Sequence, residues 1–384
     1  MSKDQAKNAI RTFALASFLN DFGSDMIYPI WPIFVRTLLG TDMAVLGFID
    51  GLGETVVSIS QAASGYVSDK IRKRKMFLWI GYLFGSASRI GYSLSTAWQH
   101  LVPFRVMDRA GKMRGAPRDA IIADESTREN RGRNFGFLRA MDNLGAVCGI
   151  VVCTLVLFLG LLDYKTLFFL ASIPSIISAL LILLFIKEKK LTKDRIYKGL
   201  SLKDLDRNFK LFLLLSALFA LGSFSYSFLL LIAQYAGFEA KYLPLLYLLF
   251  TAVASLLSLP FGKLSDRIGR KSVLTMSYVL WGLVNLTLIA VQSYWAIVLC
   301  FVFYGLHKGA SEPVQKTLVS ELAPADYKAS SFGGFQMVVG LCALPSSFVT
   351  GLLWDQFNSF VAPLYLSLGL TLLSVTMLLF VKEK

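Results

Sequence analysis

Charged side chains recur in pairs inside otherwise apolar segments of this 384-residue chain. Asp21 and Asp25 are four residues apart, as are Asp50 and Glu54, so each pair lies on one face of a helix. A charge at the centre of a bilayer costs at least ~3 kcal/mol on insertion scales, so such residues need a reason. A carboxylate in a low-dielectric cavity can bind and release a proton near neutral pH, which is the chemistry of proton coupling.

We predict a proton-coupling group among these residues, with Asp25 and Glu54 as first choices. Arg105 is about 12 Å along a helix that begins near Trp98, and it would neutralise an acid in one conformation and release it in another. The predicted proton-coupling set is Asp21, Asp25, Asp50, Glu54, Arg105, Arg139 and Asp142. The alternative is a set of salt bridges that only holds the helices together.

The composition excludes an ordinary soluble protein. Hydrophobic residues make up 55% of the chain and charged residues 17%, with a mean hydropathy of +0.58, whereas soluble domains carry about 25% charged residues. The net charge of +14 is typical of membrane proteins, which collect Lys and Arg in cytoplasmic loops, so we expect no nucleic-acid partner. The long apolar runs also exclude an outer-membrane barrel.

The sequence lacks the motifs of an ATP-driven pump or a hydrolase. No P-loop, HExxH or GxSxG pattern occurs. The four cysteines lie in apolar segments without a CxxC pair, and the two histidines are far apart. We therefore predict no enzyme activity, no cofactor and no metal. A membrane-embedded transferase and a channel are rival classes that this sequence favours much less.

Twelve spans of about 20 mostly apolar residues are predicted. They are 11–38, 43–66, 76–95, 97–118, 133–160, 165–186, 209–236, 242–264, 272–291, 293–314, 329–353 and 359–381. The span 97–118 is poorly apolar, but omitting it would invert every later loop. With twelve spans, Lys and Arg gather at both termini and in the even-numbered loops, which places both termini in the cytoplasm.

An internal repeat supports this count. GYVSDKIRKRK (65–75) matches GKLSDRIGRKS (262–272) at an offset of 197, and two further matches follow in order at nearly the same offset. The chain is thus predicted to contain two six-helix halves, 1–186 and 209–384, joined by a basic linker, 187–208. Internal symmetry of this kind is typical of secondary transporters, whose site lies between the repeats. Asp50 and Glu54 align with Tyr247 and Thr251, which suggests that one half handles ions and the other forms an apolar or aromatic wall.

The repeated loop resembles the GxxxD[RK]xGR[RK] motif of the major facilitator superfamily, and the resemblance extends over the whole chain. The predicted gating residues are Gly65, Asp69, Lys70 and Lys73 in the first copy and Gly262, Asp266, Arg267, Gly269, Arg270 and Lys271 in the second. The resemblance implies the superfamily fold: an all-α membrane protein of twelve transmembrane helices in two pseudo-symmetric halves. We expect Asp69 and Asp266 to meet a helix N-terminus of the opposite half, near Ser330 or Arg133, and so to latch the outward-facing state. The alternative is a basic turn that only sets topology.

Two further stretches refine the resemblance. RVMDRAGKMRGAPRDAIIAD (105–124) is similar to a bacterial subgroup of the superfamily, and the resemblance supports a functional role for Arg105. Antiporters of the superfamily carry a GxxxGP motif in the fifth helix. Here Gly145 and Gly149 are followed by Ile150, which weakens the case for drug/proton antiport.

These observations predict a secondary active transporter that works by alternating access and is coupled to protons. It would export an organic or amphipathic, drug-like compound; the alternative is an organic anion such as a carboxylate metabolite or a siderophore, and sodium coupling stays open. The predicted substrate cavity comprises Tyr28, Arg105, Arg109, Arg139, Tyr226, Gln234 and Gln336. The expected partners are a small-molecule substrate, protons and the lipid bilayer of a bacterial inner membrane, with the chain a monomer.

Overall fold

The computed structural model describes residues 3–71, 73–126, 131–186, 188, 206–291, 293–323 and 328–383. The chain forms two compact units, one of residues 1–39 with 56–196 and the other of residues 40–55 with 197–384. Most of the linker predicted at 187–208 lies outside the described residues, and the division into two halves at that linker stays a prediction.

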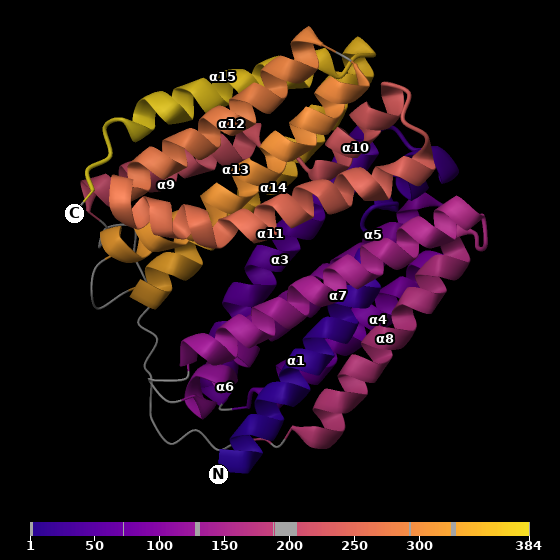
Figure 1. Ribbon diagram of the computed structural model, residues 1–384, viewed down its shortest axis with the longest axis vertical. Coiled ribbons are helices and arrows are strands. Elements are labelled where there is room, and N and C mark those ends of the chain that lie inside the picture. The colour runs from indigo at the N-terminus through magenta and orange to yellow at the C-terminus, as the bar shows by residue number, and fades with distance from the viewer. Residues whose placement is uncertain are drawn as a thin grey trace. The chain divides into compact units, whose positions relative to one another are not determined.

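The first unit is a bundle in which α1 packs against α7 and α8, and α4 packs against α5 and α8 (Figure 1). Its helices are α1 (Lys3–Asp25), α2 (Trp31–Ile33), the π-helical turn Phe34–Leu38, the second part of α3 (Met43–Ile71), α4 (Lys75–Leu94), α5 (Trp98–Ala110), the 3₁₀ turn Gly111–Arg114, α6 (Gly115–Glu125), α7 (Arg131–Leu159) and α8 (Tyr164–Phe185).

The second unit is also a helix bundle, in which α13 packs against α11 and α12, and α15 packs against α9 and α12. Besides the first part of α3, its helices are α9 (Arg207–Gly222), α10 (Tyr226–Tyr235), the 3₁₀ turn Ala240–Tyr242, α11 (Leu243–Ile268), α12 (Arg270–Ala290), α13 (Tyr294–Leu322), α14 (Lys328–Phe357) and α15 (Val361–Leu378).

The predicted spans coincide with helices, but three of them are interrupted. The span 11–38 breaks between Asp25 and Trp31, where Pro29 and Pro32 lack the N–H groups that a continuous helix needs. The span 97–118 narrows to a 3₁₀ turn at Gly111. The span 209–236 divides at Ser223, and the Ser225 hydroxyl accepts a hydrogen bond from the Ser227 N–H and caps the new helix α10.

Eight helices of the described residues are long and apolar enough to cross a membrane by length and composition. The predicted spans 11–38, 76–95, 97–118 and 293–314 fall short of that criterion. Each of these four carries a charged side chain in its interior: Asp21, Arg89, Arg105 and Lys308 respectively. The chain is therefore an all-α, multi-pass membrane protein, and charged side chains explain why these four spans are less apolar than the rest.

Glycines bring helix backbones into direct contact within the first unit. A Cβ atom at Gly145 would overlap the Phe18 carbonyl group, and one at Gly149 would overlap the Phe22 carbonyl oxygen. Small residues at this spacing let membrane helices approach closely. The two glycines of the incomplete GxxxGP motif thus form the packing surface between α7 and α1, and the fully buried Ile150 follows them.

The second unit uses the same device where the first part of α3 meets α14. A Cβ atom at Gly47 would overlap the carbonyl group of Ser347, and one at Gly51 would lie 2.6 Å from the Leu344 Cα atom. The Thr55 hydroxyl, one turn further along α3, donates to the Gly340 carbonyl oxygen at 2.9 Å. Residues 40–55 are therefore in tight backbone contact with α14 of the second unit.

An acidic residue of α14 completes this contact. The carboxylate of Asp355 accepts hydrogen bonds from the Met43 N–H at 3.0 Å and the Ala44 N–H at 2.7 Å. These N–H groups belong to the first turn of α3, where backbone N–H groups have no hydrogen-bond acceptor within their own helix. The favourable charge–dipole interaction at a helix N-terminus adds to this cap.

The two units repeat one reciprocal contact at the end of their last helices. In the first unit, the Glu188 carboxylate accepts from the Lys75 N–H at 3.0 Å, while the Lys75 ammonium donates to the Leu183 carbonyl oxygen at 2.7 Å. In the second, the Lys271 N–H donates to Glu383, and its ammonium donates to the Leu379 carbonyl oxygen. This match agrees with the internal repeat of the sequence. Lys271 is the last residue of the second copy of the loop motif, and Lys75 directly follows the first copy.

Candidate functional site

Two buried arginines of α5 stack on aromatic rings of the first unit. The Arg105 guanidinium lies 4.3 Å from the centroid of the Trp31 ring, and the Arg109 guanidinium lies 5.0 Å from that of Tyr28. The two arginines are one helical turn apart and are 2% and 6% exposed. A desolvated cation–π contact is worth about 2 kcal/mol. These predicted site residues therefore come together as one cationic, aromatic surface.

Asp108 lies between the two arginines. Its carboxylate is 3.7 Å from the Arg109 guanidinium and accepts a hydrogen bond from the Ser88 hydroxyl at 3.5 Å. Burial of an ion pair is costly unless the charges are well partnered. Asp108 is partnered both by the Arg109 guanidinium and by the Ser88 hydroxyl.

Arg89 of α4 is a buried charge that the sequence analysis missed. Its guanidinium donates to the Ser24 hydroxyl at 2.6 Å, to the Ala171 carbonyl oxygen at 2.9 Å and to the Ser175 hydroxyl. These partners belong to α1 and α8, so Arg89 joins three helices. Its position inside the predicted span 76–95 was the signal that could have identified it.

A second cluster of charges joins α1, α6 and α7. Asp142 is 7% exposed, and its Oδ2 atom lies 3.7 Å from the Arg118 guanidinium. Arg118 also donates to the Ser17 hydroxyl at 2.7 Å. Asp21 accepts a hydrogen bond at 3.0 Å from the side chain of Asn20. Arg118 was not among the predicted site residues, although it lies in the family-like stretch 105–124.

Asp50 is buried in the second unit at the N-terminus of α10. Its carboxylate accepts hydrogen bonds from the Ser225 hydroxyl at 2.7 Å and from the Ser227 hydroxyl at 2.5 Å. Only 2% of the residue is exposed. Both hydroxyl groups contact the same carboxylate oxygen, Oδ2. Asp50 therefore fastens the first part of α3 to the start of α10.

The remaining predicted residues are distributed between different environments. Asp25 is buried at the last position of α1, whereas Glu54 and Arg139 are exposed on α3 and α7. Gln234 and Gln336 are partly buried, in α10 and α14 respectively.

Aromatic rings dominate the second unit. Tyr226 packs edge-on against Tyr247 with ring centroids 5.2 Å apart, Tyr247 against Phe250 at 4.9 Å, and Phe250 against Tyr304 at 5.0 Å. The Lys308 ammonium lies 5.7 Å from the centroid of the Tyr304 ring. This series of rings agrees with the expectation that the second half supplies an aromatic wall.

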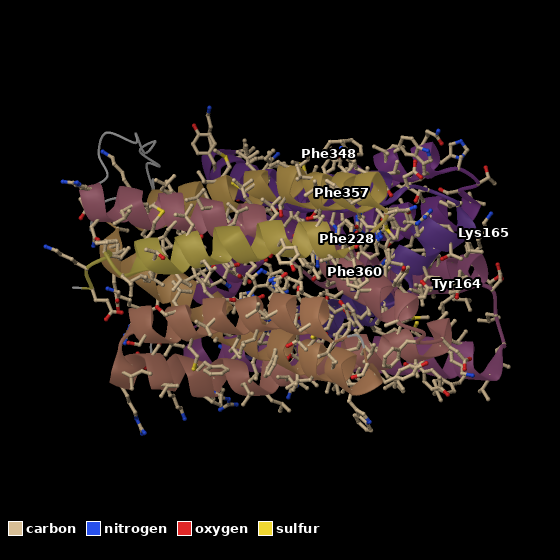
Figure 2. All side chains as sticks on the ribbon, turned by 90° about the horizontal axis from the view of Figure 1, so that it is seen from above. Tyr164, Lys165, Phe228, Phe348, Phe357 and Phe360 are labelled. Atoms are coloured by element: carbon tan, nitrogen blue, oxygen red, sulfur yellow. The ribbon has the colours of Figure 1, made fainter. Side chains whose placement is uncertain are left out.

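A further aromatic group of the second unit surrounds Trp354 of α14. The centroid of its indole lies 6.1 Å from that of Phe228 and 5.6 Å from that of Phe360. Phe228 and Phe360 are labelled in Figure 2. Tyr235, at the end of α10, contacts Phe360 with a centroid distance of 5.6 Å. These contacts hold α10 and α14 together beside the Asp50 site.

The second copy of the loop motif is organised around Arg270. Its guanidinium contacts the Asp266 carboxylate at 2.8 Å, the Glu321 carboxylate at 3.0 Å and the Ser265 carbonyl oxygen at 2.8 Å. Gly269 has φ +95°, a conformation that side chains disfavour, which explains the glycine of the motif. Asp266 thus has a partner within its own motif, and the predicted latch on the opposite half stays a prediction.

The first copy of the motif is less fully described. The ammonium of Lys70 lies 5.8 Å from the centroid of the Tyr66 ring, and Lys73 is exposed. The Asp69 side chain lies outside the described residues. The remaining motif residues, Gly65, Gly262, Arg267 and Lys271, are in or beside α3, α11 and α12 at the ends of those helices.

Membrane-spanning helix bundles with buried ionisable groups and a duplicated charged loop define a membrane transporter. The sequence model of the Major Facilitator Superfamily matches residues 13–255 and 211–384. The chain belongs to this superfamily, and it is a transporter and not an enzyme.

Individual relatives agree with this assignment. An uncharacterized MFS-type transporter of Methanocaldococcus jannaschii is 37% identical over 360 residues, which cover 92% of this chain and 89% of the relative. The quinolone resistance protein NorA of Staphylococcus aureus is 22% identical over 380 residues, covering 95% and 94% respectively. Among solved structures, the nucleoside transporter NupG (D323A mutant) has a TM-score of 0.83 at 15% identity, covering 98% of this chain and all of that one, and so supports the fold alone.

Proposed function

We propose that this chain is a proton-coupled secondary transporter that exports an organic or amphipathic, drug-like compound across the plasma membrane by alternating access. The observation that carries the proposal is the placement of buried carboxylates and guanidiniums in membrane helices of the first unit. Burying these groups is expensive, and in membrane transporters such groups serve ion and substrate pathways. Within the first unit, the cationic and aromatic group of Arg105, Arg109, Trp31 and Tyr28 would contact the substrate.

Two features favour an amphipathic aromatic substrate. The rings from Tyr226 to Tyr304 offer faces and edges on which a flat hydrophobic compound can stack. A relative at 22% identity is named for quinolone resistance. Proton coupling, outward direction and an inner-membrane location with both termini in the cytoplasm are parts of this proposal, as is a monomeric state.

An organic anion is the second candidate substrate, because Arg105 and Arg109 place two buried guanidiniums one helical turn apart on α5. Guanidiniums recognise carboxylates in a planar, two-point geometry. In this case the arginines would exchange their present partners for the carboxylate of the substrate.

The experiment that tests both candidates is uptake into everted membrane vesicles under an imposed pH gradient. We would compare tetraphenylphosphonium, a fluoroquinolone and carboxyfluorescein. The proposal predicts uptake of the cation or the quinolone that collapses with a protonophore. Uptake of carboxyfluorescein alone would favour the organic-anion function, and uptake that ignores the protonophore would contradict proton coupling.

The gating role of the repeated loop is proposed on the same basis. Asp266 and Arg270 form a compact charged turn at the end of α11, and in one conformation the Asp266 carboxylate would exchange this partner for a helix N-terminus of the other half. Asp266→Asn is expected to change the ratio of conformations with little effect on stability. Spin-label distances across the cytoplasmic side that match those of the unmodified chain would contradict this role.

A further inference from the structure

Asp355, near the end of α14, is a charged residue outside the candidate site. We infer that Asp355 is an outer latch: its carboxylate holds the first turn of α3 while the transporter is closed on the outer side of the membrane, and releases it when that side opens. The inference rests on the proposed function, because alternating access with both termini in the cytoplasm places the start of α3 and the end of α14 on the outer side.

The helix α3 is shared between the two compact units. It is continuous from Met43 to Ile71, yet residues up to Thr55 belong to the second unit and residues from Val56 belong to the first. By sequence, the whole helix lies in the predicted half 1–186. A single helix cannot follow both units when they rock against each other, so the contact of residues 40–55 with the second unit is the one that opens.

Small residues line this contact and suit it to reversible opening. A Cβ atom at Gly351 of α14 would overlap the Met43 carbonyl group, as would be the case at Gly47 and Gly51 with the backbone of α14. Small residues let helix backbones approach closely. When α3 separates, backbone carbonyl groups and the Thr55 hydroxyl become exposed, and exchanging their hydrogen bonds for bonds to water costs little net free energy.

The Asp355 carboxylate adds an electrostatic attraction to this backbone contact. It accepts hydrogen bonds from the Met43 and Ala44 N–H groups at 3.0 Å and 2.7 Å, and a negative charge is stabilised at a helix N-terminus. The Asp355 residue is exposed, so water can replace its partners when the contact opens. A cap of this kind changes an equilibrium by about 2-fold to 30-fold, which biases two conformations without locking either.

The internal repeat indicates that the fold itself does not require this carboxylate. At the repeat offset of 197, Asp355 aligns with Phe158. Phe158 lies one residue before the end of α7, the helix that corresponds to α14 in the first half. A helix in this place therefore forms without an acidic residue, and a role in the transport cycle explains Asp355 better than a role in helix formation.

The position of Asp355 mirrors that of the aspartate in the first loop motif. Asp355 lies two residues before the end of α14, and Asp69 lies two residues before the end of α3. The latch predicted from the motif brings such a carboxylate to a helix start near Ser330, at the beginning of α14. The helices α3 and α14 would then carry one contact between an acid and a helix N-terminus at each end, one for each closed state.

The test uses the full chain in lipid nanodiscs and needs no substrate. Spin labels at Asp42→Cys and Gln356→Cys, both exposed beside the latch, would report the separation of the two helix ends in a background without the native cysteines. Asp355→Ala should lower the ratio of short to long distances by about 2-fold to 30-fold. Asp355→Asn should lower it less, and Asp355→Lys more, because a helix N-terminus repels a cation.

Asp206→Ala is the matched control. The Asp206 carboxylate caps the start of α9 in the same unit and accepts a hydrogen bond from the Phe209 N–H at 2.6 Å. Its removal should lower the melting temperature without changing the distance distribution. A distribution that is the same with and without the Asp355 carboxylate, or that shifts equally in Asp206→Ala, would overturn the latch.

A flux assay separates this inference from the proposed function, because the distances require neither a transported compound nor a proton gradient. In proteoliposomes, accumulation of tetraphenylphosphonium driven by a pH gradient, together with an unchanged distribution in Asp355→Ala, would overturn the latch alone. A distribution that shifts as expected, in a chain that moves neither tetraphenylphosphonium nor carboxyfluorescein, would support the latch and contradict the proposed function.

Discussion

Replacing Gly51 by alanine should loosen the contact between α3 and α14. The added Cβ atom would lie 2.6 Å from the Leu344 Cα atom and 2.7 Å from the Ala343 carbonyl oxygen. Carbon atoms in contact normally lie about 3.5–4.0 Å apart, so the two backbones would have to separate by about 1 Å. Close-packed helices resist such a shift because their packing leaves few voids.

The cost can be expressed as a change in population. Overpacking of this kind costs about 1–3 kcal/mol, and each 1.4 kcal/mol is about a tenfold change in an equilibrium. In the alternating access that we propose, residues 40–55 exchange their contact with α14 during the cycle. Gly51→Ala should then raise the population of the separated state by about 5-fold to 150-fold.

Thiol labelling of a buried position would measure this change. Ser347 faces Gly47 across the contact and is 4% exposed, so Ser347→Cys in a background without the native cysteines should react slowly with a maleimide. Gly51→Ala should speed the reaction by about tenfold. The matched control is Gly369→Ala, because nothing lies within 4 Å of a Cβ atom there. Equal labelling rates in the two variants would refute the view that backbone contact holds α3 on α14.

Two further substitutions test the buried hydrogen bonds. Arg89→Met should destabilise the folded chain by about 3 kcal/mol or more, because it leaves several buried oxygens without a donor; a melting temperature in detergent equal to that of Lys210→Met, an exposed control, would contradict the bracing role. Ser227→Ala should cost about 1–3 kcal/mol, the cost of leaving a buried polar group without its hydrogen-bond partner, and Ser223→Ala should cost less. Equal melting temperatures of these two serine variants would show that the Asp50 contact contributes little.

The order of the helices was predictable from the sequence, since hydropathy, loop charge and the repeat give the same spans. The predicted span 11–38 did not include the break near Tyr28, although Pro29 and Pro32 were a signal for it in the sequence. The pairing of Arg105 and Arg109 with aromatic rings was harder to predict from the sequence. It depends on how α5 is rotated against the segment that carries Tyr28 and Trp31. Sequence spacing fixes which residues share a face of one helix, but it does not fix which neighbour that face meets.

The missed residues illustrate the same limit. Arg89 has its partners on α1 and α8, far away in the sequence. Arg118 on α6 pairs with Asp142 on a different helix, α7. Gly47 and Gly51 are four residues apart, a spacing typical of close helix contacts, and that signal was present in the sequence. Its significance depends on the partner helix α14, which only the structure identifies.

Proton movement driven by substrate is the most direct test of the central claim. Proteoliposomes loaded with a pH-sensitive dye and containing the unmodified chain would be challenged with tetraphenylphosphonium or carboxyfluorescein gradients, with no pH gradient imposed. The account predicts a change in internal pH that requires the protein and vanishes in Asp142→Asn. Substrate flux without any change in internal pH would contradict proton coupling and favour sodium-coupled or facilitated transport.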